Sequence, residues 1–176
     1  MKLIEDMVRG QRVALVGNAQ SLLTQGKAAE IDAHDLVIRI NLGLPGIIPA
    51  AQIGERTDIW ATAKCWGHKM PKDAKAMVFM KLTMLGDQHW RQFTHMRLPY
   101  PIVRWGHCLE DAVREFVGAD PGTGIRLLWW LKRKAQPNSV SVYGMDCWET
   151  PTHWSNRMNT PNHKPDLERK ALEALL

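Results

Sequence analysis

Residues 12–41 read RVALVGNAQSLLTQGKAAEIDAHDLVIRIN and contain two short apolar runs separated by a polar stretch. Arg12 to Gly17 is rich in β-branched and apolar residues and closes on a glycine, which is typical of a buried parallel strand. Leu36 to Ile40 repeats this pattern and ends at Asn41, and Leu22 to Ala29 between the two runs is expected to be a short helix. A strand, a helix and a second strand in this order predict a parallel α/β unit.

The rest of the chain continues this alternation of strands and helices. Further strands are predicted at Arg56 to Ala61, Ala76 to Met80, Pro101 to Arg104 and Ser139 to Tyr143. Helices, indicated by apolar residues at helical spacing, are predicted at Leu109 to Val117, Ile125 to Lys134 and Pro165 to Leu176. Because the chain has no internal repeat and no linker, residues 1–176 predict a single Rossmann-like α/β domain, with a largely parallel sheet flanked by helices.

Composition indicates a cytoplasmic protein. Of 176 residues, 45% are hydrophobic, which suffices for the core of one domain. The longest apolar run, near Leu127 to Leu131, is far shorter than the roughly 20 residues of a membrane span, and the charged segment Met1 to Gly10 lacks the apolar region of a signal peptide. Cys65, Cys108 and Cys147 are widely spaced, which predicts reduced thiols rather than a disulfide framework or a zinc knuckle. Membrane association is expected to be at most peripheral.

The net charge of +5 is compatible with an anionic partner. The basic residues are dispersed, however, and the tight cluster Lys132 to Lys134 is explained by a solvated helix end, where cations are favoured. We therefore expect no nucleic-acid partner. Single-strand binding stays as an alternative because the chain is basic and holds eight tryptophans, although most of these are expected to be core aromatics.

Candidate ligand-binding residues follow the predicted strands, at the sheet edge where ligands bind in such folds. Gly17 allows a ligand to approach the backbone, and Asn18 and Ser21 supply neutral hydrogen bonds. Asn41 and Asp146 follow two other predicted strands. The first turn is not the GxGxxG dinucleotide fingerprint, so a plain strand-to-helix turn is the alternative interpretation.

A second motif is the sequence DPGTG at residues 120–124. Exposed amides at Gly122 and Gly124, where a helix opens, form an anion site, and Thr123 adds a hydroxyl group. No lysine follows, so the motif is not a P-loop. An ordinary glycine-rich helix start is the alternative interpretation.

The third candidate is a pair of histidines, His153 and His163, in a polar segment near the end of the chain. His163 lies just before the helix predicted from Pro165, where the positive end of the helix dipole disfavours a protonated ring. A neutral histidine can accept a proton at pH 7, and Glu168, five residues on, is placed to orient the ring. The spacing of these side chains matches no familiar zinc-ligand pattern, so no metal site is predicted.

In this order the motifs resemble those of the sialyltransferases. Residues 12–41, together with GERTD at residues 54–58, resemble the large sialylmotif of the animal-type enzymes. Residues 121–144 resemble the small sialylmotif, and His153-Trp154 lies where the short third motif would be. HKPDLE at residues 163–168 is similar to the very small motif, a histidine and a glutamate separated by four residues, and the same tail is similar to bacterial sialyltransferases.

The resemblance implies an inverting, metal-independent glycosyltransferase with a GT-A-like fold. Its donor would be a CMP-activated sugar, sialic acid or a related acidic sugar, its acceptor a glycan hydroxyl, and it would need no cofactor. His163 would be the general base and His153 a donor to the departing CMP, while Trp148 is either a core aromatic or a ring beside the donor. The residues expected to bind substrate are Gly17, Asn18, Ser21, Asn41, Gly122, Thr123, Gly124, Asp146 and Glu168.

Two features bear on this resemblance. The sequence contains no Asp-x-Asp motif, the usual metal holder of nucleotide-sugar transferases, and a monophosphate leaving group has less need of a metal. The cysteines that form a disulfide in the animal enzymes are absent, with Val13 at the first position and none from Leu131 to Ser141, which suits a reducing cytoplasm. A CMP-Kdo-type transferase and a non-catalytic nucleotide-binding module of the same fold remain the alternatives.

Overall fold

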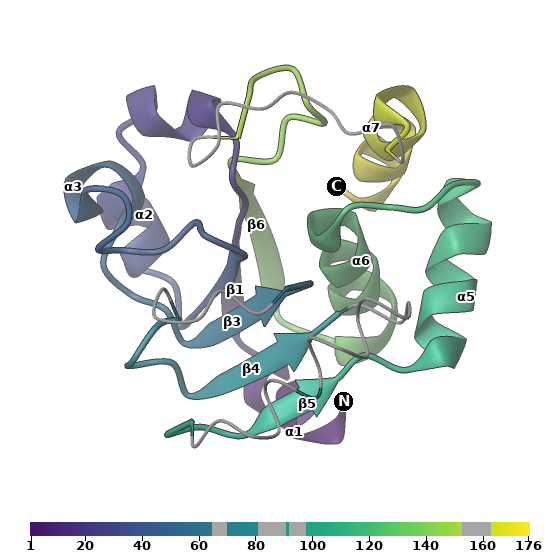
Figure 1. Cartoon of the computed structure of the whole chain (residues 1–176), viewed down its shortest axis with the longest axis horizontal. Coiled ribbons are helices and arrows are strands. Elements are labelled where there is room, and N and C mark those ends of the chain that lie inside the picture. The colour runs from purple at the N-terminus through teal and green to yellow at the C-terminus, as the bar shows by residue number, and fades with distance from the viewer. Residues whose placement is uncertain (65–69, 81–90, 92–97, 153–162) are drawn as a thin grey trace.

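In the computed structural model of the 176-residue chain, the structure describes residues 1–64, 70–80, 91, 98–152 and 163–176 (Figure 1). These residues form one sheet of six parallel strands in the order β5-β4-β3-β2-β1-β6. The strands are β1 (Arg12–Val16), β2 (Leu36–Ile40), β3 (Ile59–Thr62), β4 (Ala76–Phe79), β5 (Ile102–Arg104) and β6 (Ser139–Tyr143). The predicted parallel α/β class is therefore confirmed.

Helices cover both faces of this sheet (Figure 1). The α-helices are α1 (Lys2–Val8), α2 (Ala28–Asp32), α3 (Ala50–Ile53), α5 (His107–Val117), α6 (Thr123–Trp130) and α7 (Pro165–Leu175). A 3₁₀ turn, η1 (Gln20–Thr24), follows β1, and a π-helical turn, η3 (Leu131–Ala135), continues α6. None of the described helices combines the length and the apolar character needed to cross a bilayer.

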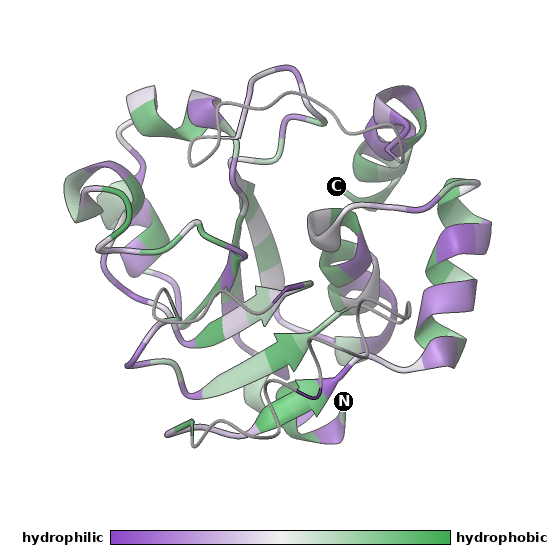
Figure 2. Cartoon of the chain, in the orientation of Figure 1, coloured by the Kyte–Doolittle hydropathy of each residue, from purple (hydrophilic) through white to green (hydrophobic). Residues whose placement is uncertain are grey.

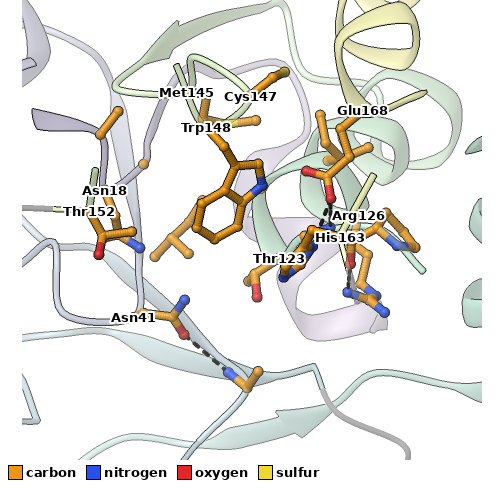
Figure 3. Close-up of a pocket in the computed structure, with 18 of the residues that line it drawn as sticks. Asn18, Asn41, Thr123, Arg126, Met145, Cys147, Trp148, Thr152, His163 and Glu168 are labelled. Carbon is orange, nitrogen blue, oxygen red and sulfur yellow. Dashed lines mark hydrogen bonds and ion pairs between the residues drawn. The ribbon is translucent and has the colours of Figure 1, made fainter. Parts of the chain in front are cut away.

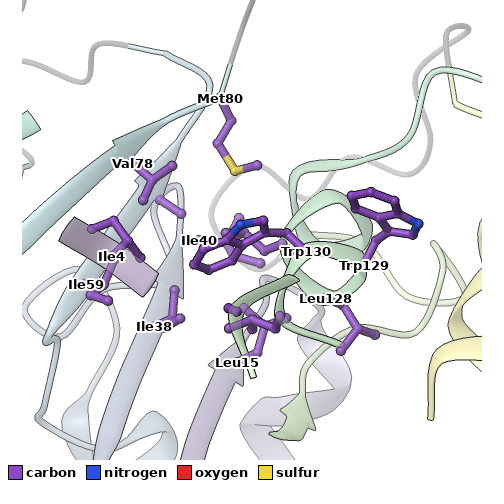
Figure 4. Packing of buried hydrophobic residues seen from close by; sticks show 14 of the residues in the cluster. Ile4, Leu15, Ile38, Ile40, Ile59, Val78, Met80, Leu128, Trp129 and Trp130 are labelled. Carbon is purple, nitrogen blue, oxygen red and sulfur yellow. The ribbon is translucent and has the colours of Figure 1, made fainter. Parts of the chain in front are cut away.

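The core follows from the two-residue period of the strands, which sends alternate side chains to opposite faces. Val13 and Leu15 of β1 pack into the larger cluster, with α1, α5, α6 and α7, whereas Ala14 and Val16 pack with η1, α2 and α3. Figure 4 shows Trp130 of α6 beside Ile40 and Ile38 of β2, while Trp129 points to the other side of the helix. Figure 2 shows hydrophobic residues concentrated in the strands, while α5 carries both hydrophobic and hydrophilic residues.

Most of the tryptophans that the structure describes belong to this core, as predicted. Trp60, Trp105, Trp129 and Trp130 are each at most 7% exposed, and Trp148 is half-buried. The four buried rings stabilise the fold and are too enclosed to stack with bases. Lys132 to Lys134 are exposed at the end of the α6–η3 helix, as expected for a solvated helix end.

The prediction of one helix from Leu22 to Ala29 is wrong. Gly26 has a positive φ of 63°, which a right-handed helix cannot accommodate, so the chain forms η1 before it and α2 after it. The predicted strand start at Arg56 is also wrong. The Arg56 N–H donates to Asp32 Oδ1 at 3.1 Å, so this residue belongs to a loop and β3 begins at Ile59.

Candidate active site

A pocket of about 410 Å³ lies at the carboxyl ends of the strands, the edge where parallel sheets bind ligands. Its lining comes from the loops after β1, β2, β3 and β6, from the N-terminus of α6, and from α5 and α7. The predicted site residues that line it are Gly17, Asn18, Asn41, Gly122, Thr123, Gly124, Asp146, His163 and Glu168. Segments more than 100 residues apart in sequence thus meet in one place, as Figure 3 shows.

Gly17 and Asn18 directly follow β1, in the loop that lies against the end of β6. The Gly17 N–H donates to the carbonyl oxygen of Tyr143 at 2.7 Å. A Cβ atom on Gly17 would lie 2.2 Å from the Gly144 carbonyl oxygen, so only glycine fits this approach. Asn18 Oδ1 is buried and has no hydrogen-bond partner among the described residues. A buried acceptor without a partner is unusual in native proteins; this one lies beside Gly43, 2.8 Å from where a Cβ atom on that glycine would be.

Asn41 closes β2 with a left-handed backbone, φ 49°, a conformation that asparagine tolerates better than most residues. Its Oδ1 accepts hydrogen bonds from the Ala63 N–H and the Thr62 hydroxyl, both at 3.3 Å, and its carbonyl oxygen accepts one from Trp60 Nε1 at 2.7 Å. Because the protein holds Oδ1, the Nδ2 amino group is the donor that this side chain can offer to a ligand.

The DPGTG motif opens α6 as predicted, although the helix begins at Thr123 and not at Ile125. Gly122 is the N-cap, and as a glycine it has no side chain with which to cap the helix. The first N–H groups of a helix have no partner within it, so the first turn of α6 presents donors at the pocket. Gly124 lies close to Met145, whose Cε and Sδ atoms would lie 2.8 Å from a Cβ atom at that position.

His163 and Glu168 are in direct contact, as the spacing predicted. His163 Nδ1 lies 2.8 Å from Glu168 Oε1, and the same oxygen accepts a hydrogen bond from the Gly122 N–H at 3.0 Å. Glu168 is only 4% exposed, so the burial of its carboxylate is compensated by these two partners. One oxygen atom therefore joins the histidine to the start of α6.

Asp146 and Ser21 are joined by a hydrogen bond at the edge of the pocket. Asp146 Oδ2 accepts hydrogen bonds from the Ser21 hydroxyl at 3.0 Å, the Thr150 N–H at 3.2 Å and the Thr150 hydroxyl at 2.5 Å. Asp146 lines the pocket, whereas Ser21 does not. Ser21 instead ties the loop after β6 to η1, and Ala19 pairs with Thr152 in the same place.

The loop after β6 has an unusual backbone that no pattern in the sequence indicates. Cys147 and Trp148 both have positive φ, 50° and 70°. For a residue as large as tryptophan this conformation is an outlier that costs roughly 1–3 kcal/mol, and such outliers cluster at functional sites. The Trp148 ring lies beside His163 with 4.8 Å between ring centroids, and Figure 3 shows the indole inside the pocket.

The cysteines that the structure describes are free thiols, which agrees with the prediction; Cys65 lies outside the described residues. Cys108 is exposed, whereas Cys147 is buried and lines the pocket. Burial, followed by the nearby carboxylate of Glu168, raises the pKa of the Cys147 thiol to about 11. A thiol in this state is protonated at neutral pH and is a poor nucleophile.

The role of His153 and the absence of a metal are two predictions that the structure does not test. His153 lies outside the described residues, so its role stays a prediction. Among the described residues, no group of three or more His, Cys, Asp or Glu side chains is placed to hold a metal ion. The absence of a metal from the reaction likewise stays a prediction.

No protein-family model matches the chain, and a search of the curated proteins found no match. Solved structures do match. A crystal structure of a mammalian sialyltransferase in complex with Gal-beta-1-3GalNAc-ortho-nitrophenol has a TM-score of 0.69 at 19% sequence identity, covering 98% of this chain and 68% of that chain. A second mammalian sialyltransferase structure has a TM-score of 0.68 at 20% identity, covering 97% of this chain and 67% of that chain. The fold is therefore the Rossmann-like fold of the sialyltransferases, as predicted.

Proposed function

We propose that this chain is an inverting glycosyltransferase that moves sialic acid, or a related acidic sugar, from a CMP-sugar donor to a glycan hydroxyl. The observation that carries the proposal is the shared Glu168 oxygen. It binds the ring of His163 and the N–H of Gly122, and so places a proton acceptor next to an anion-binding helix start. The two groups that such a transfer needs, a base and a site for the departing phosphate, thus lie in one pocket.

His163 is the proposed general base. The contact between Nδ1 and Glu168 favours the tautomer that carries its proton on Nδ1, which leaves the lone pair on Nε2. In the reaction, Nε2 would take the proton of the acceptor hydroxyl as its oxygen attacks the anomeric carbon. The Glu168 carboxylate would then stabilise the positive charge on the ring, as carboxylates do in other His-dependent sites.

The leaving CMP would be received by the N-terminus of α6. As the bond between the sugar and the phosphate breaks, negative charge grows on a single phosphate group. The first-turn N–H groups and the Thr123 hydroxyl line the pocket and would donate to that charge, with His153 as a further proposed donor. We infer that these donors are sufficient for the single phosphate of CMP, so that the metal commonly required by a diphosphate leaving group is not needed.

The nucleotide and sugar would be held at the ends of β1 and β2. Asn18 lines the pocket and Asn41 offers its Nδ2 amino group, so the ends of β1 and β2 suit a ligand that carries hydroxyl or carbonyl groups. The mammalian sialyltransferase of similar fold binds Gal-beta-1-3GalNAc-ortho-nitrophenol, which supports a glycan as the class of acceptor.

Nucleotide selectivity in the presence of EDTA tests the donor site. We expect CMP to raise the melting temperature more than CDP, UDP or NAD, because the site is matched to a single phosphate. A ligand at about a hundred times its dissociation constant stabilises a protein by roughly 2.7 kcal/mol, which a thermal denaturation curve resolves easily. Preferential stabilisation by UDP or NAD, or stabilisation by none of these ligands, would contradict the proposed donor site.

A further inference from the structure

Four charged side chains form a paired network on the pocket wall, and none of them belongs to the predicted site. Glu110 and Arg114 lie on α5, Arg126 lies on α6, and Asp120 lies in the connection between the two helices. Arg126 donates twice to the Glu110 carboxylate, from Nε to Oε2 at 2.9 Å and from Nη2 to Oε1 at 2.7 Å. Arg114 lies 2.9 Å from Glu110 and 2.9 Å from Asp120.

The central pair of this network is largely removed from solvent. The side chains of Arg126 and Glu110 are 11% and 6% exposed. Buried charges are unfavourable unless their geometry is good and their hydrogen bonds are satisfied. The two-pronged contact between a guanidinium and a carboxylate meets that condition and also fixes the orientation of both groups. The pair is therefore a rigid contact between α5 and α6.

Arg126 also holds the backbone just before α6. Its Nη1 donates a hydrogen bond to the carbonyl oxygen of Pro121. The next residue, Gly122, donates its N–H to Glu168, which in turn binds His163. A continuous series of contacts therefore runs from Arg126 through the Pro121–Gly122 peptide to the proposed base. Arg126 binds the carbonyl oxygen of the same peptide whose N–H donates to Glu168, so two side chains hold this helix start.

We propose that Arg126, fixed by Glu110, is a positioning residue for sugar transfer. It holds the Pro121–Gly122 peptide so that the Gly122 N–H meets Glu168 and the first-turn donors of α6 point at the departing phosphate. Arg126 itself does not touch the reacting atoms. This inference rests on the proposed glycosyl transfer. A helix that only needed to be joined to its neighbour would not require the second contact, from Arg126 to the Pro121 carbonyl.

The test compares Arg126→Met and Arg126→Lys with Arg133→Met, a control on the exposed surface of η3. We expect kcat for transfer to fall on the order of 10²-fold in Arg126→Met, since small displacements of catalytic groups cost that much. Lysine keeps the charge but makes a single contact, so Arg126→Lys should lie between the wild type and Arg126→Met. The control should keep the wild-type kcat.

Amide hydrogen exchange at Gly122, compared with the amides of β1 and with the melting temperature, separates a local loss of positioning from a general loss of stability. In Arg126→Met the Gly122 N–H should lose protection relative to the amides of β1. Unchanged Gly122 protection, or an unchanged kcat, in Arg126→Met would overturn the inference. If Arg126→Met does not fold, Glu110→Gln, which keeps the size of the side chain but removes its charge, is measured in the same two ways. Absence of transfer by the wild type would count against the proposed function, while the exchange at Gly122 would still decide whether Arg126 positions the peptide.

Discussion

Replacing His163 with alanine is expected to lower kcat for sugar transfer by roughly 10²–10⁴-fold, the usual contribution of a general base. The acceptor hydroxyl would lose the group that takes its proton, whereas the donor contacts at β1, β2 and α6 would remain. CMP should therefore stabilise the variant against heat as well as it stabilises the wild type. Steady-state kinetics with saturating donor, combined with a thermal denaturation series in CMP, measures both effects.

The matched control for this experiment is His107→Ala. His107 is exposed at the start of α5 and does not line the pocket, so its loss should leave kcat unchanged. Wild-type turnover in His163→Ala would exclude His163 as the base. Loss of both turnover and CMP binding would indicate that the ring maintains the pocket, in contradiction to the proposed role.

Gly17→Ala is expected to be strongly destabilising. The new methyl group would lie 2.2 Å from the carbonyl oxygen of Gly144 and 3.0 Å from its carbonyl carbon, and both atoms belong to the backbone. Because β1 pairs with β6 along its whole length, neither strand can move without a loss of sheet hydrogen bonds. We expect a cost of roughly 3 kcal/mol or more, at the upper end of overpacking effects, which lowers the melting temperature by roughly 6–12 °C.

Gly106→Ala is the control for Gly17→Ala. Gly106 precedes α5, has ordinary φ, and would have no atom within 4 Å of its Cβ. Only a modest capping preference is lost there, of about 1 kcal/mol or less. Thermal denaturation of the two variants side by side measures the difference. Equal melting temperatures would mean that the approach of β1 to β6 is not as close as the structure places it.

Most of the sheet could be predicted because its strands are short apolar runs, and β1, β2 and β6 are each followed by glycine or asparagine. The bounds of β2 and β6 agree with the prediction for this reason. The short elements could not be predicted. α3 has only four residues and α1 buries only Ile4 and Val8, so neither shows a helical period long enough to recognise. The division between η1 and α2 depends on the φ of Gly26, which a glycine in a polar stretch does not reveal.

The candidate site was predictable to the extent that it follows strand ends and helix starts. Gly17 and Asn41 could be placed together because parallel strands end at one edge of a sheet. Gly122 could be added because a helix start rich in glycine is a common anion site. Which side chains pair with one another depends instead on how closely the helices and loops pack in the folded protein. Arg126 meets Glu110 across two helices, and Ser21 meets Asp146 from 125 residues away, and no sequence pattern encodes either pair.

The most direct test of the central claim is sugar transfer itself, measured with the purified chain in EDTA. CMP-sialic acid and CMP-Kdo are each supplied with a Gal-beta-1-3GalNAc acceptor; mass spectrometry follows CMP release and the glycosylated product, and NMR spectroscopy gives the anomeric configuration of that product. We predict acceptor-dependent release of CMP with formation of a product in which the anomeric configuration of the donor is inverted. A folded protein that transfers neither sugar, or that transfers one only after a divalent metal is restored, would contradict the account of a metal-independent CMP-sugar transferase.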